Sequence, residues 1–171
     1  MFNNILILNT GGTFNKKYNQ KTGTLDVPSD SDVVKNILND IFKTNKKPKI
    51  STIISKDSLD IKKKDRFLIL EMIKNAKEDK IVIIHGTDTM NKTAKFLNKH
   101  INNKSIILTG SMQPFSISQI EPTGNLLMAL GFIQNQNKKG IFISMNGIVD
   151  RYDKVKKDYK KALFKRSKIN E

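Results

Sequence analysis

Five short apolar runs rich in isoleucine and valine alternate with segments of helical periodicity, and this alternation constrains the fold more than any other feature. The runs span residues 5–8, 50–54, 81–84, 106–108 and 141–145. Apolar residues with helical spacing lie between them, at about 31–42, 61–76, 91–98 and 124–135. Strands that alternate with helices are typical of parallel sheets covered on both faces. We therefore expect a three-layer, doubly wound α/β fold with a mainly parallel sheet.

The bulk composition is typical of a single domain. At 171 residues and 37% hydrophobic content, residues 1–171 can bury one core, so we expect a single domain. The absence of cysteine excludes disulfides, thiolate metal ligands and cysteine nucleophiles. Residues 1–8 lack the features of a signal peptide, and no segment approaches the roughly 20 apolar residues of a membrane span. We expect a cytoplasmic protein with no membrane association.

The formal net charge of +15 raises the question of nucleic-acid binding. Lysines are scattered along the chain among 16 acidic residues, and no basic helix carries aromatics at a stacking spacing. The sequence therefore predicts a solvated basic surface and no nucleic-acid partner. Only residues 154–168 are locally dense in basic side chains. If they form a free arm, it should bind RNA or anionic lipid at low salt alone.

Three of the apolar runs end in short segments rich in glycine and hydroxyl side chains. These segments are Thr-Gly-Gly-Thr at 10–13, His-Gly-Thr-Asp-Thr-Met at 85–90 and Thr-Gly-Ser-Met-Gln-Pro at 109–114. Ligands of doubly wound sheets bind outside the carboxyl ends of the parallel strands. The three segments therefore predict one shared site. Residues 15–30 have no periodicity and are expected to form a lid, because long irregular loops are commonly functional.

Each segment also has a purely structural interpretation. A Gly-Gly pair can be a plain tight turn, or it can let the backbone approach a ligand and leave Thr13 at the crevice. Thr87, Asp88 and Thr89 precede a predicted helix, so one of them can serve as its N-cap. His85 is expected to be a hydrogen-bonded residue at the strand end and not a base.

Together these segments resemble the bacterial-type L-asparaginase and glutaminase family. Thr-Gly-Gly-Thr and His-Gly-Thr-Asp-Thr-Met resemble its two signatures, and Thr-Gly-Ser-Met-Gln-Pro resembles a substrate-loop segment. The resemblance covers nearly the whole chain but only the family's N-terminal domain, which has a flavodoxin-like or Rossmann-like fold. It implies hydrolysis of L-asparagine, or of L-glutamine, to the acid and ammonia through a threonine acyl-enzyme. It implies no metal and no organic cofactor.

The resemblance also implies roles for individual residues. Thr13 corresponds to a nucleophilic threonine, and Thr87 with Asp88 to the second threonine and its acid. The family's lysine falls at Lys157, with Lys154 and Lys156 as alternatives. A threonine hydroxyl needs a base, and a lysine held by an aspartate in a dry site can be that base. The resemblance further implies that backbone N–H groups near Ser111 and Thr87 hold the oxyanion. Expected substrate contacts are Gly12, Ser55, Gly86, Ser111 and Met112.

Three departures from the family pattern leave alternatives open. Lys56 stands where the family has a neutral amide, so we expect a changed charge in the site. Thr24 stands where a loop tyrosine is expected, and Tyr18 is the nearby substitute. The family completes its site with a C-terminal domain from a neighbouring subunit, which is absent here, so we expect self-association or a partner chain. The chain is thus expected to be an amidohydrolase or a non-catalytic relic that keeps an amino-acid-binding pocket.

Overall fold

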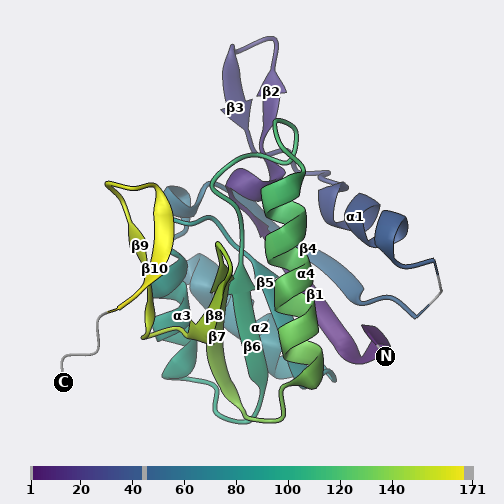
Figure 1. Ribbon diagram of the computed structural model, residues 1–171, viewed down its shortest axis with the longest axis vertical. Coiled ribbons are helices and arrows are strands. Elements are labelled where there is room, and N and C mark those ends of the chain that lie inside the picture. Colours follow the sequence, from purple (N-terminus) through teal and green to yellow (C-terminus); the bar gives the residue numbers. More distant parts are fainter. Residues whose placement is uncertain (1, 44–45, 168–171) are drawn as a thin grey trace.

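The computed structural model describes residues 2–43 and 46–167, and a six-stranded sheet lies at its centre (Figure 1). The strand order is β4-β1-β5-β6-β7-β8. The first five strands are parallel, and β8 runs antiparallel to β7. The strands of this sheet are β1 (Ile5–Gly11), β4 (Lys49–Lys56), β5 (Lys80–Ile84), β6 (Ser105–Thr109), β7 (Gly140–Met145) and β8 (Ile148–Arg151).

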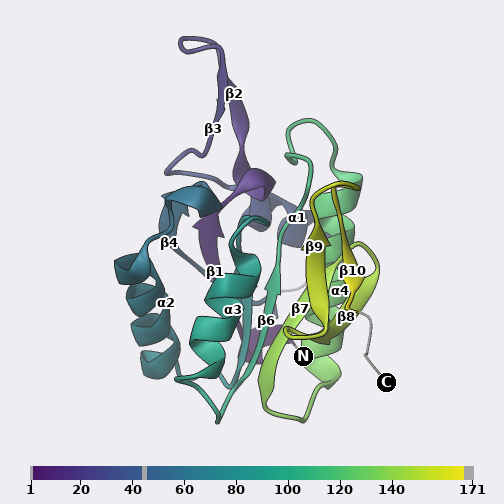
Figure 2. The ribbon, with the colours of Figure 1, turned by 90° about the vertical axis from the view of Figure 1, so that its left-hand side faces the viewer.

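Helices cover both faces of the sheet, which confirms the predicted three-layer α/β fold. Successive side chains of a strand point to opposite faces, so Ile5 and Ile7 join one core while Leu6 and Leu8 join the other. The first core lies under α1 and α4, and the second lies under α2 and α3, as the side view shows (Figure 2). The helices are α1 (Val33–Ile41), α2 (Lys63–Asn75), α3 (Met90–Asn98) and α4 (Ile120–Asn135). No helix in the described ranges is long and apolar enough to span a membrane.

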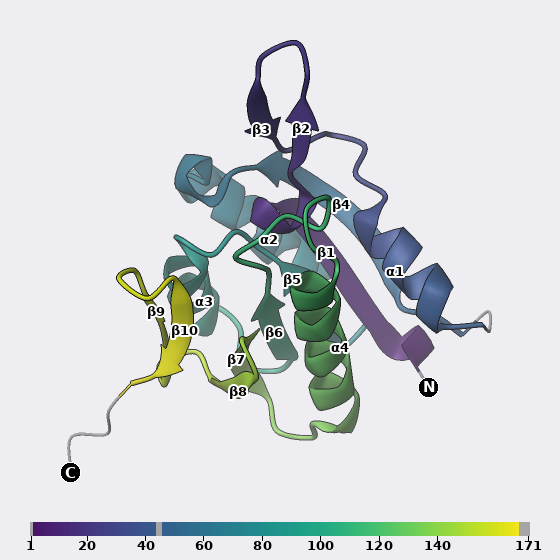
Figure 3. The ribbon, with the colours of Figure 1, turned by 45° about the horizontal axis from the view of Figure 1, so that its top comes forward.

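The chain makes two hairpins outside the central sheet that the sequence pattern did not indicate. The expected irregular loop contains β2 (Lys17–Asn19) and β3 (Thr24–Asp26), which pair antiparallel and project from the body in all three ribbon views (Figure 3). The basic segment is neither a free arm nor a helix, because β9 (Val155–Asp158) pairs with β10 (Leu163–Arg166). Lys168, the last residue of that predicted segment, lies outside the described residues.

Glycines let the carboxyl ends of four strands, β4, β1, β5 and β6, touch through their backbones. A Cβ at Gly12 would lie 2.4 Å from both Cα and N of Gly86, and one at Gly11 would lie 2.6 Å from the Lys56 carbonyl oxygen. A Cβ at Gly110 would lie 2.3 Å from the carbonyl oxygen of His85. Any larger residue would force these strand ends apart. Short 3₁₀ turns at the same edge are η2 (Thr13–Asn15), after β1, and η3 (Ser58–Asp60), after β4.

His85 is fully buried and ties the end of β5 to α3. Its Nδ1 lies 2.8 Å from the carbonyl oxygen of Gly86, which can only accept, so Nδ1 carries the proton. Its Nε2 then accepts from the Thr93 hydroxyl at 2.9 Å, and Arg66 donates to the same hydroxyl at 3.1 Å. Burial lowers the pKa of His85 to about 4. The expected role of His85 as a hydrogen-bonded strand-end residue is confirmed.

We predict that Gly12→Ala destabilises the protein by about 3 kcal/mol or more. The new methyl group would clash with the Gly86 backbone, and the positive φ at this position is unfavourable for alanine. Gly147→Ala is the matched control, since its φ of 79° is close to the 74° of Gly12 and no atom lies within 4 Å of the new Cβ. The control should lose only about 1 kcal/mol. Urea unfolding measures both values, and equal losses would contradict the contact.

We also predict a pH dependence of stability that comes from His85. The folded-state pKa lies below the ordinary 6.5, so the folded chain resists protonation and stability is lost as the pH falls below 6.5. Between pH 7 and pH 5 the unfolding free energy should fall by about 2 kcal/mol. His85→Gln keeps one donor and one acceptor without titrating, and it should flatten this slope. The exposed His100→Gln control should keep the slope.

Candidate active site

The carboxyl edge of the sheet carries a linked lysine, threonine and aspartate. Lys157 Nζ donates to Thr87 Oγ1 at 2.8 Å and to Asp88 Oδ1 at 2.7 Å. The Lys157 side chain is 10% exposed and that of Asp88 is 33% exposed. Thr87 is buried. Of the three candidate lysines, the structure therefore joins Lys157 to the motif after β5, whereas Lys154 and Lys156 are exposed.

Lys157 reaches this edge because the β9–β10 hairpin is anchored on the core. Val155 and Phe164 are buried with residues of β7 and α3. The Asn91 side chain, in the first turn of α3, donates to the carbonyl oxygens of Tyr152 at 3.1 Å and Val155 at 2.7 Å. The Asn146 side chain accepts from the Phe164 N–H at 2.9 Å. These amide contacts set the position of β9 and hence of its lysine.

None of the three candidate N-cap side chains caps α3. The residue at the N-cap position is Thr89, and its side chain makes no capping hydrogen bond. Its hydroxyl instead donates to the Ser58 carbonyl oxygen at 2.7 Å. Thr87 and Asp88 both face Lys157. The capping interpretation is therefore wrong, because these side chains find partners across the strand ends and not within their own helix.

Thr13 and Thr87 each follow one of two glycines that touch at neighbouring strand ends. Gly12 packs on Gly86, and each glycine directly precedes one threonine. The turn is held by paired amides, since Asn15 Nδ2 donates to Asn9 Oδ1 at 2.9 Å and to the Gly11 carbonyl oxygen at 2.8 Å. Within the described part of the chain, the Thr13 hydroxyl has no hydrogen-bond partner. It is the only hydroxyl of its segment free to meet a ligand, because Thr10 donates to the Ile84 carbonyl oxygen.

Lys56, the last residue of β4, bonds a carboxylate of α2. Lys56 Nζ bonds Asp65 Oδ1 at 2.7 Å, on the first turn of α2. Asp65 also accepts from the Lys62 N–H. The expected charge change at Lys56 is therefore offset by a carboxylate that sequence reasoning did not identify. Ser55, the preceding residue, is half-buried.

Asp57 in the same segment is bound by a second lysine. Lys16 Nζ lies 2.6 Å from Asp57 Oδ2, and the Leu59 N–H donates to its other oxygen at 3.1 Å. Burial alone would raise the pKa of Asp57, but these two hydrogen bonds and the charges of Lys16 and Lys157 hold it below its ordinary value. The ion pair joins the base of the β2–β3 hairpin to the segment after β4.

The loop after β6 is fixed by Glu121. This carboxylate, in the first turn of α4, accepts from the N–H groups of Met112 at 2.9 Å and Gln113 at 3.0 Å. Ser111 is buried, and its hydroxyl donates to the Gln113 carbonyl oxygen. The predicted substrate residues Ser111 and Met112 thus lie in a rigid loop whose polar groups are already largely engaged.

The structure does not bring Tyr18 or Thr24 to the Thr87 group. Tyr18 is 64% exposed and lies opposite Leu25 in the β2–β3 hairpin. Thr24 donates to Asp26 on the same hairpin. Neither side chain hydrogen-bonds Thr13, Thr87 or Lys157. A different tyrosine does reach the group, since the Tyr159 hydroxyl donates to the Asp88 carbonyl oxygen at 3.1 Å.

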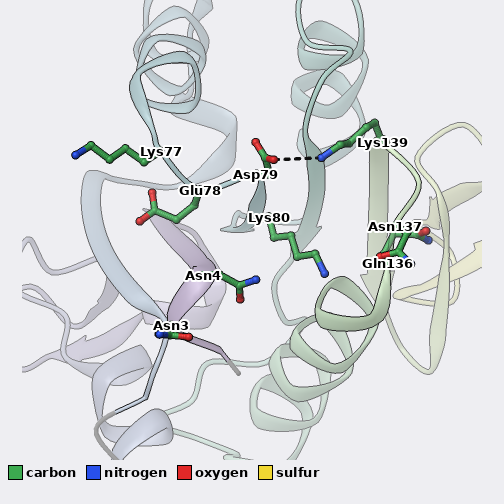
Figure 4. A pocket seen from close by; sticks show the side chains of 9 residues that line it. All are labelled: Asn3, Asn4, Lys77, Glu78, Asp79, Lys80, Gln136, Asn137 and Lys139. Carbon is green, nitrogen blue, oxygen red and sulfur yellow. Dashed lines mark hydrogen bonds and ion pairs between the residues drawn. The ribbon is translucent and has the colours of Figure 1, made fainter.

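A polar cavity of about 430 Å³ lies elsewhere in the molecule (Figure 4). It opens at the amino ends of the parallel strands, opposite the Thr87 group, and none of the predicted site residues lines it. Its walls come from residues 3–4, 77–80, 136–137 and 139. Within residues 2–43 and 46–167, no group of three or more histidine, aspartate or glutamate side chains is arranged to hold a metal ion.

Comparisons with known proteins identify the family of this chain. The family model "Asparaginase, N-terminal" matches residues 4–164. L-asparaginase 2 of Bacillus subtilis is 29% identical over 147 residues, which cover 80% of this chain and 38% of that protein. A glutamyl-tRNA(Gln) amidotransferase component of Methanococcus maripaludis is 32% identical over 160 residues, 84% of this chain and 35% of that protein.

Among solved structures, the thermostable L-asparaginase from Thermococcus kodakarensis superimposes with a TM-score of 0.80 at 28% identity. The match covers 95% of this chain and 50% of that one. The chain therefore spans at most about half the length of these relatives. Because the family model covers nearly all of it, the chain belongs to the asparaginase family, within that family's N-terminal part.

Proposed function

We propose that this domain, residues 1–171, hydrolyses the side-chain amide of L-asparagine, or of L-glutamine, through a threonine acyl-enzyme. The single observation that supports this function best is the bonding of Lys157 to both Thr87 and Asp88 at 2.8 and 2.7 Å. The Gly12–Gly86 contact supports it further, because Thr13 and Thr87 each directly follow one of these two glycines. Neither the chemistry nor the residue types require a metal or an organic cofactor.

In the proposed reaction the Thr13 hydroxyl attacks the amide carbon. Thr87 and Lys157, when the lysine is unprotonated, take up the proton, and Asp88 keeps Lys157 in place. Collapse of the tetrahedral intermediate breaks the C–N bond, and the leaving nitrogen takes that proton from the same pair and departs as ammonia. Water then attacks the ester carbon while its proton passes to the pair. The bond from the acyl carbon to Thr13 Oγ1 breaks, Thr13 regains a proton from the pair, and L-aspartate or L-glutamate is released. Backbone N–H groups near Thr87 and Ser111 would stabilise the oxyanion.

Substrate binding is proposed for residues at the ends of four neighbouring strands. Asp88 is two-thirds buried and would bind the α-amino group. Ser55 would bind the α-carboxylate, and the bonding of Lys56 to Asp65 leaves this role unaffected by the lysine. Further contacts are proposed for Gly12, Gly86, Ser111 and Met112. Tyr18 is proposed as an assisting residue only if the β2–β3 hairpin closes, because its ring is now exposed.

We propose in addition that another polypeptide segment, from a second copy or a different chain, covers this site. Four large apolar side chains around the strand ends are unusually exposed: Leu59 at 71%, Ile117 at 66%, Ile120 at 85% and Tyr159 at 68%. Exposed apolar groups of this kind mark interaction surfaces. The similarity to a protein named as one component of an amidotransferase fits a domain that acts within a larger assembly.

Ammonia release tests the catalytic assignment. We expect Thr13→Ala, Thr87→Ala and Lys157→Met each to lower kcat by about a thousandfold or more, because the first removes the nucleophile and the other two remove parts of the group that activates it. Lys156→Met is the matched control, since it removes a neighbouring exposed lysine and should leave the rate within about twofold. Wild-type rates in the Lys157→Met variant, or a large loss in the control, would show that the lysine is misassigned.

The alternative function is a binding module without catalysis. The exposed position of Tyr18 favours it, because an exposed ring does not assist the proposed nucleophile. It is tested by calorimetry with L-aspartate. We expect binding heat that disappears in Asp88→Ala, because the α-amino group loses its carboxylate partner. Binding without ammonia release from L-asparagine would favour the module, and no heat with either amino acid would exclude it.

A further inference from the structure

Tyr159 makes two contacts with the group that carries the proposed chemistry, and no sequence motif pointed to it. It lies two residues beyond Lys157, at the start of the turn between β9 and β10. Its hydroxyl donates to the backbone carbonyl oxygen of Asp88 at 3.1 Å. The centre of its ring lies 5.1 Å from Lys157 Nζ. One side chain thus touches both the lysine and the residue that holds the lysine.

The lysine and the tyrosine differ sharply in exposure. The Lys157 side chain is only 10% exposed, whereas Tyr159 is 68% exposed. Tyr159 therefore lies on the solvent side of the ammonium group, and little of its own surface is buried against the core. A residue so exposed contributes little to folding, so its two contacts need another explanation than packing.

The two contacts restrain the lysine in complementary ways. A cation above a ring face is attracted by the negative quadrupole of the ring, and this attraction limits the rotamers of a flexible lysine side chain. The hydroxyl contact fixes the backbone at Asp88, whose carboxylate accepts from the same ammonium group. Without both restraints, Lys157 could turn into solvent and lose the 2.8 Å contact with Thr87.

We propose that Tyr159 is a positioning residue, which covers the Lys157 ammonium group and holds it against Thr87 and Asp88. The inference rests on the proposed function for its catalytic consequence, but the restraint itself can be measured without any turnover. Tyr159 acts through Lys157 and does not take part in proton transfer.

The first measurement is the acetylation rate of Lys157 with limiting acetic anhydride, followed by peptide mass spectrometry. Lys156, exposed on the same peptide, is the internal reference. Relative to wild type, Tyr159→Leu should raise the Lys157 rate about fivefold or more, because it removes the ring and the hydroxyl. Tyr159→Phe keeps the ring and should give a rate between the two. Equal Lys157 rates in all three proteins would overturn the proposal.

The second measurement is steady-state ammonia release. Tyr159→Leu should lower kcat about tenfold with KM within twofold, and Tyr159→Phe should recover most of the loss. Lys160→Leu, an apolar substitution on the same exposed turn, should change neither the kinetics nor the acetylation of Lys157. A loss confined to KM, or no recovery by phenylalanine, would overturn positioning through the ring.

The two measurements separate failure of this inference from failure of the proposed function. If the wild-type protein releases no ammonia, the amidohydrolase proposal fails, while the acetylation rates still decide whether Tyr159 restrains Lys157. Circular dichroism melting of each variant should match wild type, because Tyr159 is largely exposed. Unchanged melting also shows that altered acetylation does not come from unfolding.

Discussion

The backbone contact between Gly12 and Gly86 is the constraint on which the candidate site depends. Two parallel strands end side by side, and a Cβ at Gly12 would lie 2.4 Å from Gly86, while one at Gly86 would lie 2.6 Å from the Cβ of Ser58. Close approach is possible only for glycine at these two positions. Thr13 and Thr87, which follow these glycines, therefore leave neighbouring strand ends. The same edge is crowded further by Gly11 against Lys56 and by Gly110 against His85.

Lys157 is held at this edge by a different part of the fold. Lys157 is not on a strand of the central sheet, because β9 belongs to a separate two-stranded hairpin. Its position depends on two buried apolar anchors, Val155 and Phe164, and on the side-chain amides of Asn91 and Asn146. The proposed chemistry therefore combines residues fixed by strand geometry with one residue fixed by docking of a distant hairpin.

Some of the many lysines have structural partners. Lys56 and Lys16 are paired with carboxylates near the site. The Lys104 ammonium group is 8% exposed and donates to the carbonyl oxygens of Ala76 and Glu78, just after α2 ends. A count of lysines overstates the charge that is free to attract a partner, because several ammonium groups neutralise acids or cap a helix.

The sequence by itself determined the order of strands and helices, the parallel sheet and the gathering of three polar segments at one edge. These follow from local periodicity and from the rule that parallel strands end on the same side. It also placed the lysine at Lys157 through the resemblance. The buried face of α2 was less predictable: Ile69, Leu70 and Ile73 are buried, while Phe67 and Leu68 remain about 40% exposed. Which of these side chains are buried depends on how α2 packs against the sheet.

Only the tertiary structure decided which side chains meet. The bond of Lys56 to Asp65, the contact of Tyr159 with Asp88, the amide anchors of β9 and both hairpins involve residues whose local sequence has no distinctive pattern. Polar contacts of this kind depend on distances of a few tenths of an ångström between elements far apart in the chain. Periodicity shows which face a residue occupies, but it does not contain the packing that sets those distances.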